Sequence, residues 1–162
     1  MRILILTFLL LIELIIESTI LPFIKIGGAA LNLVLITIVS IGLIYGKTQG
    51  MVLGLIAGLF HDILFGRVLG FHALSYMLIG YLMGIISERV YRDNKLISFL
   101  FTALGVLLYH TSFYFLQYFS GIEFSIFQYL KGTTIASMLM NAIIAFFIYP
   151  IFLKLSQQDL LR

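Results

Sequence analysis

The sequence contains no cysteine and no tryptophan, only 2 prolines, and charged residues fill just 10% of its 162 positions. The absence of cysteine excludes disulfides and cysteine-ligated metals. A soluble domain carries roughly 25% charged residues, so the scarcity of charge excludes an ordinary soluble fold. With 62% hydrophobic residues, most of the chain must lie in lipid or against itself. We therefore expect a single integral membrane domain over residues 1–162.

Six apolar stretches are long enough, or nearly so, to cross a membrane, which takes about 20 residues. Each is expected to be a helix, because backbone polar groups in lipid must be satisfied within the segment. The first stretch is too long for a signal peptide, and no small-residue cleavage pattern precedes Pro22. The predicted fold class is an all-α polytopic membrane protein, a bundle of about six transmembrane helices. The expected spans are 3–24, 29–45, 48–65, 70–87, 96–119 and 132–153.

Five spans is the alternative count, because the third and fourth stretches are short and could form a shallow hairpin. The distribution of lysine and arginine sets the orientation. With the N-terminus inside, seven of these residues fall in the cytoplasm and three, Lys25, Arg67 and Lys131, fall outside. The basic run SERVYRDNK at 87–95 dominates this count and also suits anionic lipid headgroups. We expect both termini to be cytoplasmic.

Glycines recur at four-residue spacing in the third stretch, at Gly50, Gly54 and Gly58, and the fourth repeats the spacing at Gly80 and Gly84. Small residues at this spacing share one helix face and let another backbone approach closely. Two interpretations follow. The glycines either pack helices tightly within the bundle, or they form a groove for the membrane helix of a partner protein.

Charged and histidine side chains interrupt the apolar sequence just after these glycines. His61, Asp62, Arg67 and Gly70 are expected to form a polar turn at the outer face, in which Asp62 either caps a helix terminus or pairs with Arg67. Adjacent residues on a helix point about 100° apart, so His61 and Asp62 are poorly placed to chelate one metal ion. No G-x-S-x-G motif, phosphate-binding loop or nucleic-acid motif occurs. We expect no catalytic residues, no metal and no cofactor.

Polar residues inside the expected spans are the remaining candidates. Glu13 and Glu17 are four residues apart and share a helix face, and His110 lies in the fifth span. A charge at the centre of a bilayer costs about 2.5–3.5 kcal/mol on insertion scales. Glu17 is near the outer end and can reach water, whereas Glu13 makes either a structural hydrogen bond or a functional polar contact. A proton relay is not expected, because no other span supplies a chain of acids.

The region from Gly50 to Arg89 resembles the bacterial rod shape-determining protein MreD family. The likeness rests on a glycine-spaced helix that runs into G-L-x-x-D-I-L, a short loop, G-x-x-A-L-x-Y and G-Y-L-x-G. One departure is that Leu31, where the family tends to have proline, precedes Asn32. The matching residues are Gly54, Gly58, Leu59, Asp62, Ile63, Leu64, Gly70, Ala73, Leu74, Tyr76, Gly80, Tyr81 and Gly84.

The resemblance implies a non-enzymatic membrane scaffold of the cell-elongation machinery, which directs lateral peptidoglycan synthesis and rod shape. Its expected partner is MreC, a bitopic protein with an extracytoplasmic coiled coil, and it links indirectly to MreB and the elongation peptidoglycan synthases. It also implies the cytoplasmic membrane, no nucleic acid, and an architecture like the substrate-binding subunits of energy-coupling vitamin transporters. Our hypothesis is that Gly50, Gly54 and Gly58, continued by Asp62, contact the partner.

Two other functions stay open at this stage. A substrate-capture subunit for vitamin uptake would need an outward pocket, which Glu13, Glu17, His72, His110 and Tyr114 could line. Such subunits dock a coupling protein through small residues on the first helix, and here that helix is bulky throughout. A lipid-handling enzyme would need a polar site on at least two helices, which the His61–Asp62 pair and His110 could begin to supply.

Overall fold

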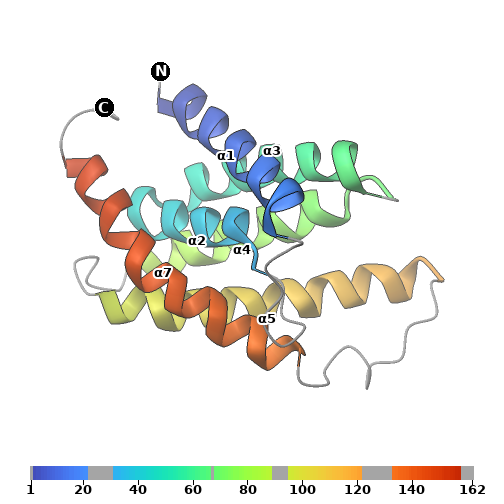
Figure 1. Ribbon diagram of the computed structural model, residues 1–162. Helices are drawn as coiled ribbons and strands as arrows, with labels where there is room; N and C mark the ends of the chain where they lie inside the picture. The colour runs from blue at the N-terminus through green and yellow to red at the C-terminus, as the bar shows by residue number, and fades with distance from the viewer. Residues whose placement is uncertain (1, 22–30, 67, 89–94, 122–132, 158–162) are drawn as a thin grey trace.

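The computed structural model describes residues 2–21, 31–66, 68–88, 95–121 and 133–157. Within these ranges the chain forms six α-helices and no strand (Figure 1), so the predicted all-α fold is confirmed. The helices are α1 (Arg2–Thr19), α2 (Leu33–Tyr45), α3 (Lys47–Phe65), α4 (Phe71–Ser87), α5 (Lys95–Phe119) and α7 (Thr133–Gln157).

The helix bounds agree with the expected spans within one residue at both ends of α3, α4 and α5. Three bounds differ by more. α1 ends at Thr19, before Pro22, α2 begins only at Leu33, and α7 continues to Gln157 with Pro150 inside it. The expected extensions at 22–24 and 29–30 lie outside the described residues.

Three of the described helices are long and apolar enough to cross a membrane: Lys47–Phe65, Leu96–Phe119 and Ile135–Gln157. α2 and α4 are shorter apolar helices. At 1.5 Å per residue, the 13 residues of α2 reach only about 20 Å, less than the roughly 30 Å of a hydrocarbon core. A helix this short is tolerated in a membrane protein when other helices surround it.

α2 is such a helix, because every residue from Val34 to Ile44 is buried. Its sequence LVLITIVSIGLIY is hydrophobic on all sides, as is typical of a helix with no solvent-facing stripe. α1, α3, α4, α5 and α7 all contact it. The hydrophobic core therefore lies around α2, at the centre of the bundle in Figure 1.

Successive helices run in alternating directions, and the beginning of α1 and the end of α7 lie at the same end of the bundle (Figure 1). We call this the terminal end. At the opposite end, which we call the distal end, α1, α3 and α5 finish and α2, α4 and α7 begin. Lys47 and Glu88 form an ion pair of 3.2 Å at the terminal end of α3 and α4.

The glycine-rich faces of α3 and α4 pack directly against each other. A Cβ atom added to Gly54 would lie 2.7 Å from the Tyr76 carbonyl carbon, and one added to Gly58 would lie 2.6 Å from that of His72. A Cβ on Gly50 would lie 2.9 Å from the Gly80 carbonyl carbon. Packing within the bundle, one of the two interpretations of this spacing, therefore accounts for the glycines. In place of the expected partner helix, α4 covers the face formed by Gly50, Gly54 and Gly58.

Candidate functional site

Asp62 caps the beginning of α4 from the last turn of α3. Its Oδ2 accepts hydrogen bonds from the backbone N–H groups of Gly70 (2.8 Å) and Ala73 (3.1 Å). Its Oδ1 accepts one from the His72 N–H (3.1 Å) and lies 2.7 Å from His72 Nδ1. The first N–H groups of a helix have no partner within it and carry partial positive charge, so a carboxylate is well suited to this position.

Capping is thus the role of Asp62, one of the two roles that the sequence left open for it. Gly70 has φ 103°, a left-handed conformation that favours glycine. Asp62 is 1% exposed and its carboxylate is occupied by α4, so it offers no surface to a partner helix. Arg67, the other residue expected to hold this turn, lies outside the described residues.

The two histidines of this region stack on each other. The ring centroids of His61 and His72 are 3.9 Å apart with an interplanar angle of 29°. The Asp62 contact fixes the His72 ring, whereas His61 Nδ1 is buried and has no hydrogen-bond partner among the described residues. Tyr76 and Tyr109 continue the aromatic cluster, with ring centroids 5.3 Å apart.

A network of amide side chains joins three helices beside this cluster. Asn32 caps α2 by accepting a hydrogen bond from the Leu35 N–H (2.7 Å), and its Nδ2 donates to Tyr76 Oη (2.8 Å). The Asn32 backbone N–H donates to Asn141 Oδ1 on α7 (2.9 Å). Asn141 Nδ2 in turn donates to the backbone oxygen of Ser137 (2.7 Å). The network links the beginning of α2 to the first halves of α4 and α7.

Sequence reasoning did not identify Asn141, Ser137 or the partner of Asn32. Asn32 and Asn141 are 109 positions apart, and nothing local to either segment links them. One signal was available, because Asn141 is the single carboxamide in the largely apolar stretch 132–153. An amide at such a depth is expected to find a hydrogen-bond partner within the protein.

The two glutamates of α1 have different surroundings. Thr37 Oγ1 on α2 donates a hydrogen bond of 2.8 Å to Glu13 Oε1, which gives Glu13 a structural contact between α1 and α2. Glu17, one turn nearer the distal end, accepts a long hydrogen bond of 3.4 Å from the Val34 N–H. Of the two acids, Glu17 faces the cavity described next.

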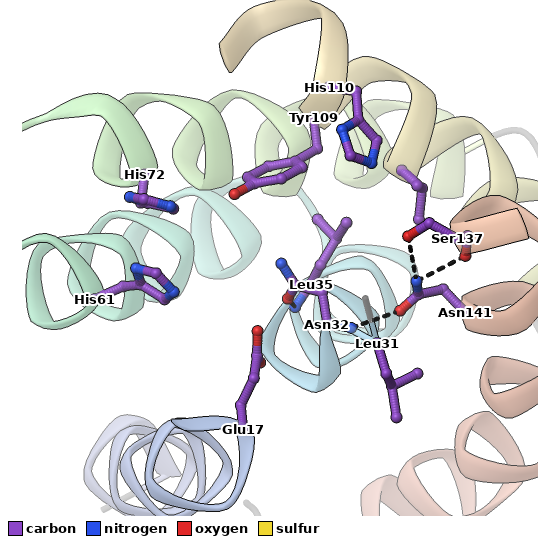
Figure 2. Close-up of a pocket in the computed structure, with 11 residues that line it drawn as sticks. Glu17, Leu31, Asn32, Leu35, His61, His72, Tyr109, His110, Ser137 and Asn141 are labelled. Atoms are coloured by element: carbon purple, nitrogen blue, oxygen red, sulfur yellow. Dashed lines mark hydrogen bonds between the residues drawn. The ribbon is translucent and has the colours of Figure 1, made fainter. Parts of the chain in front are cut away.

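A cavity of about 270 Å³ opens at the distal end among α1, α2, α3, α4, α5 and α7 (Figure 2). Of the residues that the sequence singled out, it brings together Glu17, His61, His72 and His110. Glu13 and Tyr114, the other two members of the pocket expected for a substrate-capture subunit, do not line it. Its lining residues are Glu17, Leu31, Asn32, Leu35, His61, His72, Val106, Tyr109, His110, Ser137 and Asn141.

A second cavity of about 270 Å³ adjoins the first between α1 and α3. Leu14, Glu17, Ser18, His61 and Phe65 line it, so the two cavities have Glu17 and His61 in common. We call the first the polar cavity and the second the side cavity.

Most of the side chains that line the polar cavity can form hydrogen bonds. It presents a carboxylate, imidazoles, a phenol, a hydroxyl and carboxamides. The Ser137 hydroxyl, the one aliphatic hydroxyl in the lining, lies 3.2 Å from Asn141 Nδ2. Among the described residues no group of three or more His, Asp or Glu side chains is placed to hold a metal ion. The arrangement suits recognition of a polar group.

Fold and site together define an all-α, multi-pass membrane protein with a polar cavity at the distal end of its helix bundle. A family model described as rod shape-determining protein MreD matches residues 1–158. The chain therefore belongs to the MreD family of shape-determining structural proteins and has a role in rod shape determination. No curated protein and no solved structure matches the chain.

Proposed function

We propose that this chain is a non-enzymatic scaffold of the cell-elongation complex in the bacterial cytoplasmic membrane. It binds MreC, is linked indirectly to MreB and the elongation peptidoglycan synthases, and helps direct lateral peptidoglycan synthesis. Membership of the MreD family supports this function.

The proposed orientation places the terminal end in the cytoplasm and the distal end outside. Lys47 and Lys154 lie on the segments at the terminal end. The expected topology assigns seven of the ten lysines and arginines of the sequence to the cytoplasmic side. An excess of positive charge on cytoplasmic segments supports this assignment. The polar cavity then opens toward the side that carries the coiled-coil domain of the bitopic partner.

The observation that carries the proposed binding site is the contrast between two surfaces. The glycine face of α3 is already covered by α4. The polar cavity, in contrast, is open and lined by hydrogen-bonding groups from several helices. We place the MreC contact here, with the segment just outside its membrane helix entering the cavity.

A matched pair of variants on α5 tests this site. His110 lines the cavity, whereas the next residue, Thr111, is exposed on another face of the same helix. His110→Trp puts an indole into the cavity and should reduce the MreC that co-purifies in mild detergent by about tenfold, the effect of blocking a central interface contact. Thr111→Trp should leave it unchanged. Equal recovery of MreC with both variants would contradict the proposed site.

One observation favours a second function, the capture of a small molecule. The polar cavity contains three of the residues expected for such a pocket, Glu17, His72 and His110. Its volume of about 270 Å³ is close to the lower limit of roughly 300 Å³ for ligand pockets. Mass spectrometry of small molecules extracted from the purified protein tests this function. A stoichiometric vitamin-sized compound together with an ATPase module, and without MreC, would favour it over the scaffold.

A further inference from the structure

The side cavity lies between the last turns of α1 and α3. Phe65, which lines it, is 50% exposed, and Ile15 and Ile63 on the same two helices are 60% and 66% exposed. In a membrane protein, large apolar side chains with this exposure face lipid tails. The side cavity therefore connects a lipid-facing surface with the polar cavity, because Glu17 and His61 border both.

The polar groups at this junction call for a hydrogen-bond donor that carries positive charge. Glu17 accepts hydrogen bonds from the backbone N–H groups of Leu33 and Val34, the latter long at 3.4 Å, and receives no charged donor from the described residues. His61 Nδ1 is buried without a partner among the described residues. Buried polar atoms that lack partners cost free energy, which a bound ligand recovers. None of the described residues that line either cavity is a lysine or arginine. A cation is thus favoured at this junction, and an anionic group is disfavoured.

We propose that the side cavity binds an aminophospholipid of the phosphatidylethanolamine type from the leaflet at the distal end. Its primary ammonium lies between the Glu17 carboxylate and His61 Nδ1, and an acyl chain leaves past Leu14 and Phe65. A primary ammonium supplies three N–H donors, as a lysine does, so it can satisfy both groups at once. Phosphatidylcholine has no N–H donor, and phosphatidylglycerol has no cationic group. This site shares Glu17 and His61 with the cavity proposed for MreC, but lipid binding does not depend on MreC.

The test uses the full chain without any partner. The purified protein is delipidated, reconstituted in vesicles of equal parts phosphatidylethanolamine, phosphatidylcholine and phosphatidylglycerol, and then extracted gently. Native mass spectrometry counts the lipids that remain bound. We expect phosphatidylethanolamine to be retained about tenfold over phosphatidylcholine, the effect of one charge-assisted hydrogen bond. Equal retention of the three lipids would overturn the proposal.

Glu17→Gln should abolish this preference, because the amide removes the negative charge. Glu13→Gln is the matched control, since Glu13 lies one turn away on α1, lines neither cavity and bonds to Thr37. It should keep the preference for phosphatidylethanolamine. Unchanged preference in Glu17→Gln would overturn the proposal.

A further series needs no variant and remains decisive if Glu17→Gln fails to fold. The wild-type chain is offered phosphatidylethanolamine and its mono-, di- and trimethylated forms. Retention should fall stepwise as N–H donors are lost. Retention that does not depend on methylation would overturn the proposal. So would loss of MreC binding in Glu17→Gln without any lipid preference in the wild type, because a basic side chain of the partner would then occupy the junction.

Discussion

Gly54→Ala adds a single methyl group where the backbones of α3 and α4 approach closely. The new Cβ would lie 2.7 Å from the carbonyl carbon of Tyr76 and 3.0 Å from the backbone nitrogen of Met77. Non-bonded carbon atoms prefer about 3.5–4.0 Å, so the two helices must separate by roughly 1 Å. The obstacle is backbone, which cannot rotate away as the end of a side chain can.

Two effects of opposite sign determine how far the Gly54→Ala substitution changes the free energy of unfolding. Overpacking costs about 1–3 kcal/mol, and we expect the upper end because a whole helix must shift. Replacing glycine with alanine inside a helix recovers about 1 kcal/mol. The net loss is therefore about 2 kcal/mol, which for a domain of this size lowers Tm by about 4–8 °C.

The assay is thermal unfolding of the isolated chain in detergent, with Gly105→Ala on α5 as the matched control. It gains the same helix propensity, but the nearest atom to its Cβ is the Val39 Cγ2 methyl at 2.8 Å, a side-chain atom that can adjust. We expect a smaller change in Tm for Gly105→Ala than for Gly54→Ala. A Gly54→Ala variant that keeps the wild-type Tm but loses MreC would refute the reasoning and return the glycine face to the partner.

Three further predictions follow from the polar contacts and the topology. Asp62→Ala leaves the first N–H groups of α4 without their acceptor and should lower the free energy of unfolding by about 2 kcal/mol; a Tm equal to wild type would argue against the cap. A double-mutant cycle of unfolding should give a coupling free energy of about 0.6–1.7 kcal/mol between Glu13 and Thr37, as for other hydrogen bonds in membrane proteins. Additive effects of the two mutations would mean that their hydrogen bond contributes nothing to stability. The chain has no cysteine, so single cysteines can report its orientation. Ser18→Cys should react with an impermeant maleimide added outside intact cells, whereas Gln157→Cys should react only after permeabilisation. The reverse pattern would invert the proposed orientation.

Local sequence patterns predicted the elements that depend on local physics. Length and hydropathy located α3, α4 and α5 closely. Asp62 and Gly70 after a glycine stripe predicted a polar turn, in which Asp62 was expected either to cap a helix or to pair with Arg67. The sequence did not predict that α2 is too short to cross a membrane. An apolar run alone does not reveal that other helices will enclose it. Its completely apolar sequence, without a polar stripe, was the available signal.

The candidate site was predictable only in part. Glu17, His61 and His110 were recognised as polar residues in an apolar chain, but their assembly into one cavity depends on how six helices pack. The bonds that link Asn32 to Tyr76 and Asn141 join segments that lie far apart in the sequence. Spacing could not decide whether the glycines face a partner or another helix of the same chain, because both uses need the same small residues.

Site-specific photo-crosslinking in native membranes tests the central claim most directly. A benzophenone amino acid replaces Tyr109, which lines the polar cavity, or Phe115, which is 55% exposed on α5. We predict an adduct with MreC at position 109 and only lipid adducts at position 115. An MreC adduct at 115 with none at 109 would contradict the account, because the partner would then bind the outer surface of α5 and leave the cavity empty.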